Sequence, residues 1–146
     1  MGKVINFNRV SDPYGEFSNF ALFKINIMGK VWPTSEHYFQ AQKCDDPFYQ
    51  KEILKTATPM MAAELGRSLG FKLRDDWEQI KNDVMYEALS AKFTQHHDLK
   101  ELLLSTDTAI IVEHTSRDDY WGDGGDGSGK NMLGKTLMRV REELKG

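Results

Sequence analysis

Residues 31–43 constrain the fold more than any other stretch, because a strand pattern passes directly into a helix pattern there. The run reads VWPTSEHYFQAQK, and Thr34 or Ser35 can cap the helix by accepting a hydrogen bond from an unpaired backbone N–H. Helical spacing aligns three polar side chains on one face, those of Glu36, Gln40 and Lys43. This face is either an ordinary solvated surface or one wall of a ligand site, and spacing alone leaves both interpretations open.

The totals of the 146-residue sequence predict one domain, residues 1–146, with one hydrophobic core. Hydrophobic residues make up 40% and charged residues 28%, which is typical of a globular protein, and no apolar run is long enough to cross a membrane. The net charge of -3 argues against a broad electrostatic grip on nucleic acid. It still allows a small pocket for one phosphorylated ligand.

Cysteine and histidine usage limits both the compartment and the chemistry. The single cysteine, Cys44, excludes an internal disulfide and fits a reducing compartment. The N-terminus lacks the apolar segment of a signal peptide, so we expect a cytoplasmic protein without a membrane partner. Because the sequence has no Cys/His cluster and no H-E-x-x-H motif, we expect no metal site and no cofactor.

The order of the expected elements predicts an α+β domain, mostly helical, with a small β-sheet. Strands are expected at residues 3–7, 23–27, 31–32 and 108–114, the second and third forming a hairpin. Helices are expected to begin near residues 35, 47, 59, 76, 98 and 131. The prolines at 47 and 59 suit the first turn of a helix, where no backbone N–H is needed.

A glycine-rich loop precedes the last expected helix. Residues 124–130 fit G-x-x-x-x-G-K, the start of a P-loop, but Asn131 stands where Ser or Thr would hold Mg²⁺. Only a terminal helix follows, so the strands of a P-loop sheet have no sequence left, and we reject a nucleotide triphosphatase. The acidic residues of the loop also miss the positions of an EF-hand; they are Asp118, Asp119, Asp123 and Asp126.

Two interpretations of the loop remain, a surface loop and a ligand-binding loop. Trp121 either packs down as an anchor or stacks on a planar ligand. Glycines allow backbone N–H groups to approach a ligand closely, and a helix beginning near Asn131 offers its positive end to an anion. These features favour ligand binding.

Three blocks in order carry a family resemblance: YGEFSNF at 14–20, WPTSEHYFQAQK at 32–43, and YWGDG at 120–124 with GKNMLG at 129–134. Together they closely resemble the NADAR family, also called the YbiA-like family, from about Ile5 to Arg141. The resemblance implies an N-glycosidase of YbiA-like fold. Members are associated with hydrolysing the base–ribose bond of phosphoribosylamino-pyrimidines, early intermediates of riboflavin biosynthesis, and others with removing ADP-ribose from guanine in nucleic acid.

The resemblance also implies site residues. Catalytic roles fall on Glu36, Trp121 and Asp123. Substrate binding falls on Asn19, Gln40, Lys43, Arg67, Gly122, Gly124, Lys130 and Asn131, with the basic residues and the loop N–H groups meeting phosphate. The implied partners are a small-molecule phosphorylated riboside or ADP-ribose, and ADP-ribosylated single-stranded nucleic acid; a module that binds ADP-ribose without catalysis is the alternative of another class.

The chemistry sets one geometric expectation. Breaking a ribosyl C1′–N bond builds positive charge on the sugar, which a carboxylate can stabilise while it activates water. The helix N-terminus is expected to keep Glu36 ionised for this purpose. The base stabilises its own departure in part, so a strong protein acid is not required. Glu36 and Trp121 should then face the same small cavity.

Overall fold

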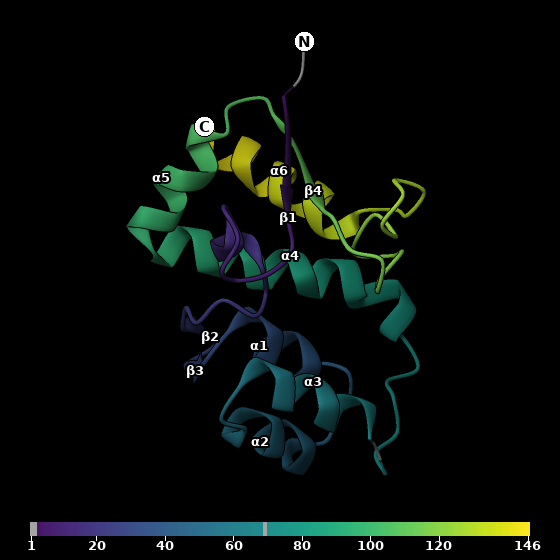
Figure 1. The fold of residues 1–146 in the computed structure, drawn as a ribbon. Coiled ribbons are helices and arrows are strands. Elements are labelled where there is room, and N and C mark those ends of the chain that lie inside the picture. The colour runs from purple at the N-terminus through teal and green to yellow at the C-terminus, as the bar shows by residue number, and fades with distance from the viewer. Residues whose placement is uncertain (1–2, 69) are drawn as a thin grey trace.

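The computed structural model describes residues 3–68 and 70–146, and in these the chain forms two small sheets and six α-helices (Figure 1). The strands are β1 (Val4–Phe7), β2 (Ile25–Ile27), β3 (Lys30–Trp32) and β4 (Ile110–Glu113). The helices are α1 (Ser35–Ala41), α2 (Pro47–Lys55), α3 (Pro59–Arg67), α4 (Trp77–Gln95), α5 (His97–Ser105) and α6 (Met132–Lys145), with a 3₁₀ turn, η1, at Gly15–Phe17. The predicted α+β class is confirmed.

The strands pair in two separate sheets rather than in the one small sheet expected from the sequence. Strands β2 and β3 form the predicted hairpin, with Ile25 opposite Trp32. Strand β1 pairs in parallel with β4, and Phe7 lies opposite Glu113. A parallel pair needs a long connection, which the helices α1–α5 supply here. This pairing places the end of β4, and the loop that follows it, beside the start of the chain.

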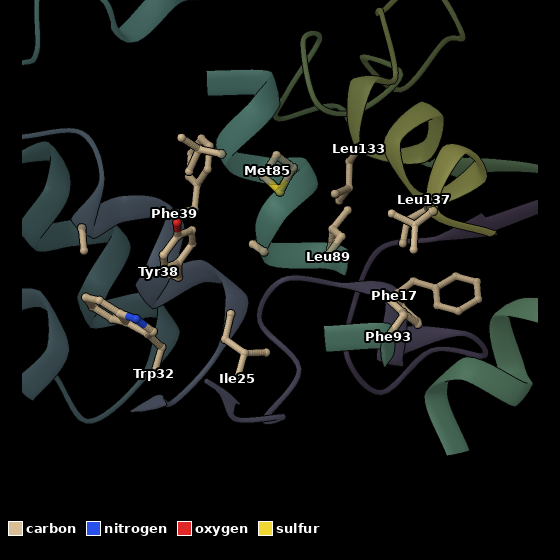
Figure 2. Close-up of a cluster of buried hydrophobic side chains, with 14 of the residues drawn as sticks. Phe17, Ile25, Trp32, Tyr38, Phe39, Met85, Leu89, Phe93, Leu133 and Leu137 are labelled. Atoms are coloured by element: carbon tan, nitrogen blue, oxygen red, sulfur yellow. The ribbon is translucent and has the colours of Figure 1, made fainter. Parts of the chain in front are cut away.

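Helix α4 is the element on which both halves of the molecule pack. It contacts α1 and β2 on one side and α5 and α6 on the other, and Figure 1 shows it crossing the middle of the fold. Its side chains Met85 and Leu89 lie between Phe39 of α1 and Leu133 of α6 in the core, and Phe93 packs against Phe17 (Figure 2). No helix in residues 3–68 or 70–146 is long and apolar enough to span a bilayer.

Helix α1 is buried along its whole length, so its polar face is not a solvated one. The predicted cap is present, because the Thr34 hydroxyl accepts a hydrogen bond from the His37 N–H at 3.2 Å. The helix start is also tied to Asn19, whose Oδ1 accepts from the Ser35 hydroxyl at 2.7 Å and whose carbonyl accepts from the Glu36 N–H at 3.3 Å. The first sequence block thus fixes where the second one begins its helix.

Lys92 of α4 is a fully buried ammonium below this junction, with 0% of its surface exposed. Its Nζ donates to the Ser18 carbonyl at 2.9 Å and lies 5.5 Å from the centre of the Phe93 ring. Burial lowers the pKa of Lys92 to about 7, because the charged form loses its hydration.

Lys92→Met should change how stability depends on pH. From about pH 7 to about pH 10 the unfolded chain holds a proton on Lys92 that the folded chain releases, so this residue makes the free energy of unfolding rise with pH. The slope is at most about 1.4 kcal/mol per pH unit. Urea unfolding at about pH 7 and pH 9 should show this difference in the wild type and in the exposed control Lys51→Met, and not in Lys92→Met. An equal pH slope in all three proteins contradicts it.

Candidate active site

Glu36 lies in the first turn of α1 with 9% of its surface exposed. The Gln40 amide, one turn further, donates from Nε2 to Glu36 Oε2 at 2.7 Å. Gln40 lies so close to Gly66 of α3 that a Cβ at Gly66 would come within 2.2 Å of Gln40 Oε1. Close packing of α3 on α1 therefore confines the amide beside the carboxylate, and a side chain at position 66 would displace it.

Burial raises the pKa of Glu36 above its ordinary value. The hydrogen bond from Gln40 and the charges of Lys43 and Arg67 oppose this rise, and the charge of Asp118 adds to it. Burial therefore acts on Glu36 against the helix N-terminus, and the expectation that Glu36 is ionised stays a prediction. A carboxylate with a raised pKa is a better proton acceptor than an exposed one.

Two cations lie near this acid, as the sequence blocks suggested. Burial lowers the pKa of Lys43, the charge of Glu36 raises it, and the charge of Arg67 lowers it again, so all three groups are within electrostatic reach. Lys43 is half-buried and Arg67 is exposed at the end of α3. Among the described residues, neither forms an ion pair within 4.0 Å. The two positive charges are thus available to an anionic ligand.

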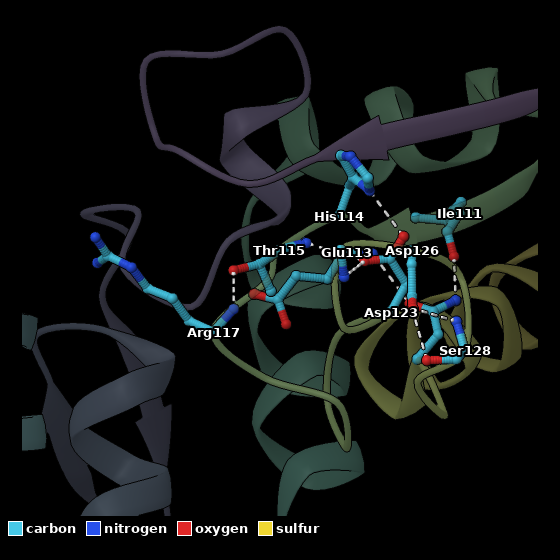
Figure 3. A network of polar contacts seen from close by, with 10 residues as sticks. Ile111, Glu113, His114, Thr115, Arg117, Asp123, Asp126 and Ser128 are labelled. Carbon is cyan, nitrogen blue, oxygen red and sulfur yellow. Dashed lines mark hydrogen bonds and ion pairs between the residues drawn. The ribbon is translucent and has the colours of Figure 1, made fainter.

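Asp123 is the centre of a hydrogen-bond network at the end of β4 (Figure 3). Its carboxylate accepts from the His114 ring at 2.7 Å, from the Thr115 N–H at 3.1 Å and from the Gly125 N–H at 2.9 Å. Burial raises the pKa of Asp123, but these hydrogen bonds outweigh burial and hold the pKa below its usual range. The carboxylate therefore ties β4 to the glycine-rich loop, and direct contact with substrate remains a prediction.

Trp121 bridges the loop and helix α1. Its ring meets the Phe39 ring edge to face, with centroids 5.3 Å apart, and the Tyr120 ring at 4.9 Å. Asp118 fixes the backbone below it by accepting from the Trp121 N–H at 2.8 Å. Since Phe39 follows Glu36 by one helical turn, Glu36 and Trp121 lie at the same junction of α1 and loop. The contacts support the anchor interpretation of the indole.

The start of α6 does not offer its N–H groups to an anion, contrary to the sequence expectation. The N–H groups of Asn131, Met132 and Leu133 donate to loop carbonyls at 2.9 to 3.0 Å. The Asn131 side chain is also engaged, because its Oδ1 accepts from the Glu113 N–H at 3.0 Å and its Nδ2 donates to the Ile111 carbonyl at 2.9 Å. The loop thus folds back over the N-terminus of α6, and the Asn131 side chain connects β4 to α6 through its two hydrogen bonds.

The N–H groups of the glycine-rich loop are likewise used inside the loop. Gly124 donates to the Asp118 carbonyl at 3.1 Å, Gly129 to the Asp123 carbonyl at 2.8 Å, and Lys130 to the Asp119 carbonyl at 2.8 Å. These three N–H groups are therefore engaged within the loop, and phosphate binding by the loop backbone stays a prediction.

Two further predicted binding residues have roles within the loop. Gly122 permits close packing, because a Cβ there would lie 2.6 Å from the Thr115 methyl group. The Lys130 ammonium lies 5.5 Å from the centre of the Tyr120 ring. Substrate contact by Gly122, Gly124, Lys130 and Asn131 stays a prediction.

Glu113 belongs to this site and was missed by sequence reasoning, which placed it only in a buried strand. It is the last residue of β4 and is half-buried. Burial raises its pKa to about 7, and the charges of Asp118, Glu36 and Asp123 raise it in the same sense. The signal that could have found it is an acid that closes an apolar strand directly before the loop with the W-G-D block.

Two hollows can be compared with the positions of the predicted site residues. A hollow of about 350 Å³ is lined by Ser116, Arg117, Asp118, Asp119, Gly124 and Ser128. A larger one of about 500 Å³ is lined by Asp45, Asp46 and residues 71–76, and none of the predicted site residues lines it. Neither hollow is lined by Glu36 or Trp121, so their shared cavity stays a prediction. Within the described residues, no group of three or more His, Cys, Asp or Glu could hold a metal ion.

Trp121→Ala should lower the free energy of unfolding by about 2 to 4 kcal/mol, because it removes one aromatic contact between loop and helix and one within the loop. Trp121→Phe should lose about half as much or less. Urea unfolding measures both, with the exposed Phe48→Ala as a control expected to stay within about 0.5 kcal/mol. A stability equal to that of the wild type, together with a raised KM, would instead favour the stacking interpretation.

The sequence and the fold have counterparts among known proteins. The family model described as the NADAR domain matches residues 6–145. The N-glycosidase YbiA of Escherichia coli K12 is 56% identical over 141 residues, which cover 97% of this chain and 88% of that protein. The N-glycosidase Npun_R5314 of Nostoc punctiforme is 45% identical over 145 residues, covering 97% of this chain and 93% of that protein.

A longer relative and a solved structure extend the comparison. The riboflavin biosynthesis protein PYRR, chloroplastic, of Zea mays is 39% identical over 158 residues, covering 98% of this chain and 25% of that protein. The NMR structure of the E. coli protein YbiA matches with a TM-score of 0.92 at 55% identity, covering 99% of this chain and 87% of that one. The resemblance seen in the sequence is thus confirmed, and the chain belongs to the NADAR domain family.

Proposed function

We propose that this protein is an N-glycosidase that hydrolyses the bond between a base and a phosphorylated ribose, with an early phosphoribosylamino-pyrimidine of riboflavin biosynthesis as substrate. The observation that carries the proposal is a buried carboxylate, Glu36, held by an amide and flanked by Lys43 and Arg67. The names of the relatives support it, since two of them are N-glycosidases and a third is a riboflavin biosynthesis protein.

Glu36 is suited to the reacting end of such a substrate. Cleavage of the C1′–N bond gives the ribose positive charge, which a nearby carboxylate stabilises strongly where water is excluded. Gln40 holds Glu36 Oε2, so Oε1 is the oxygen left to accept a proton from the attacking water. The raised pKa of Glu36 makes this proton transfer more favourable than it is for an exposed carboxylate.

Lys43 and Arg67 are suited to the other end of the substrate. Both are cations near Glu36 without a carboxylate partner among the described residues, and phosphate is the anion that a phosphorylated ribose presents. Binding the phosphate there fixes the sugar relative to Glu36, which converts remote binding energy into correct positioning. Asn19 contributes indirectly, because it holds the start of α1.

Glu36→Gln should keep the fold and lose at least about a hundredfold in kcat, the usual scale for a general acid–base group. Ribose 5-phosphate release from a phosphoribosylamino-pyrimidine measures the rate, and the exposed Glu64→Gln on α3 is the matched control. Turnover near that of the wild type would remove Glu36 from the mechanism. The other substrate class would be indicated if the protein released ADP-ribose from ADP-ribosylated guanine in single-stranded nucleic acid and had no activity on the pyrimidine. A binding module would be indicated if the protein bound ADP-ribose and turned over neither substrate.

Lys43→Met and Arg67→Met should each raise KM for the phosphorylated riboside by about 10- to 100-fold, since a hydrogen bond to a charged group contributes about 1.5 to 3 kcal/mol. Hydrolysis of the same riboside without its phosphate should change little in either variant. The exposed Lys30→Met serves as the charge-matched control. If both substrates are affected equally, the two cations do not bind the phosphate.

A further inference from the structure

We propose that Glu113 is the second catalytic carboxyl of this site and donates the proton that the departing base nitrogen requires, while Glu36 acts on the attacking water. This inference rests on the proposed N-glycosidase function. It adds a protein acid that the sequence did not indicate, and it divides one hydrolysis between two acids carried by separate parts of the fold.

The backbone of Glu113 is fixed on three sides. Strand pairing sets it opposite Phe7, its N–H donates to Asn131 Oδ1 at 3.0 Å, and its carbonyl accepts from the Asp123 N–H at 2.9 Å. These bonds join β1, β4, the loop and α6 at one residue. A carboxyl placed this firmly keeps its position during a reaction, which proton transfer to a bound substrate requires.

The side chain of Glu113, in contrast, is not engaged. Asp118 and Asp123 use their carboxylates to accept backbone N–H groups, whereas no described residue hydrogen-bonds or forms an ion pair with the Glu113 carboxylate. Figure 3 shows the Glu113 side chain pointing away from the bonds around Asp123, on the side of the network where Arg117 lies. Glu113 is thus the acid at the end of β4 that remains available to a ligand.

The surrounding charges divide the roles between the two acids. The acids that face Glu113 are Glu36 from α1 and Asp118 and Asp123 from the loop, and Asp123 is itself paired with His114. Only negative charges act on Glu113, and with burial they raise its pKa to about 7. The charges of Lys43 and Arg67 act on Glu36 instead. The neighbouring cations oppose the rise in pKa at Glu36, and no cation opposes it at Glu113, which suits Glu113 to carry the proton that the base needs.

The reaction balances with these two groups and one water. The C1′–N bond breaks, its electron pair stays on nitrogen, and that nitrogen takes the carboxyl proton of Glu113. A water oxygen bonds to C1′ and gives one proton to the Glu36 carboxylate. The products are the free base and the ribose, Glu113 ends as carboxylate and Glu36 as carboxyl, and exchange of one proton with solvent restores the starting state.

Glu113→Gln should lose at least about a hundredfold in kcat on the phosphoribosylamino-pyrimidine, with KM nearly unchanged. The wild-type kcat should fall as pH rises above about 7, and this decline should be absent in Glu113→Gln. A second substrate, 4-nitrophenyl ribofuranoside 5-phosphate, has a leaving group that departs without a proton. On it Glu113→Gln should retain a rate close to that of the wild type, whereas Glu36→Gln should be slow on both substrates.

The controls separate the possible failures. Glu142→Gln, an exposed change on α6, controls for loss of one carboxyl. Glu113→Asp keeps the acid, and it should retain the pH-dependent decline if Glu113→Gln does not fold. Equal losses on both substrates, or no loss on either, overturn the role of Glu113 and leave the N-glycosidase proposal intact. If the wild type releases ribose 5-phosphate from neither substrate, the proposed function itself fails, and the role of Glu113 fails with it.

Discussion

A carboxylate in a helix that is buried along its whole length loses most of its hydration, and much of the site follows from this constraint. The fold compensates Glu36 with the Gln40 amide and with the charges of Lys43 and Arg67. The amide reaches the carboxylate from one turn further along α1, and α3 packs against the amide at Gly66, where a side chain would collide with it. Helix packing therefore also sets the electrostatic environment of Glu36. Lys43 and Arg67, whose charges oppose the rise in its pKa, are also suited to binding a phosphate.

The glycine-rich loop after β4 satisfies many of its own backbone hydrogen-bonding groups. Asp118 and Asp123 accept N–H groups much as an N-cap does, and Gly129 lies so near Asp123 that a Cβ would come within 2.5 Å of its carbonyl carbon. Glycine is needed at position 129 for this close approach. A sequence that resembles a phosphate-binding loop thus uses its N–H groups to build a rigid support for Trp121 and Glu113.

The parts of the fold that were predicted correctly are those with local causes. Thr58 with Pro59, and Asp46 with Pro47, begin α3 and α2 through contacts within a few residues. The pairing of β1 with β4 has no such signal, because its partners are far apart in sequence. The rise in the pKa of Glu36 has no local signal either, because burial depends on elements from the whole chain. Glu113 became visible as a site residue only when β4 was placed beside the loop.

The two acids belong to different halves of the molecule, yet both depend on α4. Helix α1, which carries Glu36, packs directly on α4, and β4, which carries Glu113, packs on α6 and through it on α4. Helix α4 packs through apolar side chains such as Met85 and Leu89, and close-packed interiors of this kind deform little (Figure 2). The relative placement of Glu36 and Glu113 is therefore set by a helix that contributes no predicted site residue. Hydrophobic packing in the centre of the fold therefore holds the two carboxyls at fixed positions relative to each other.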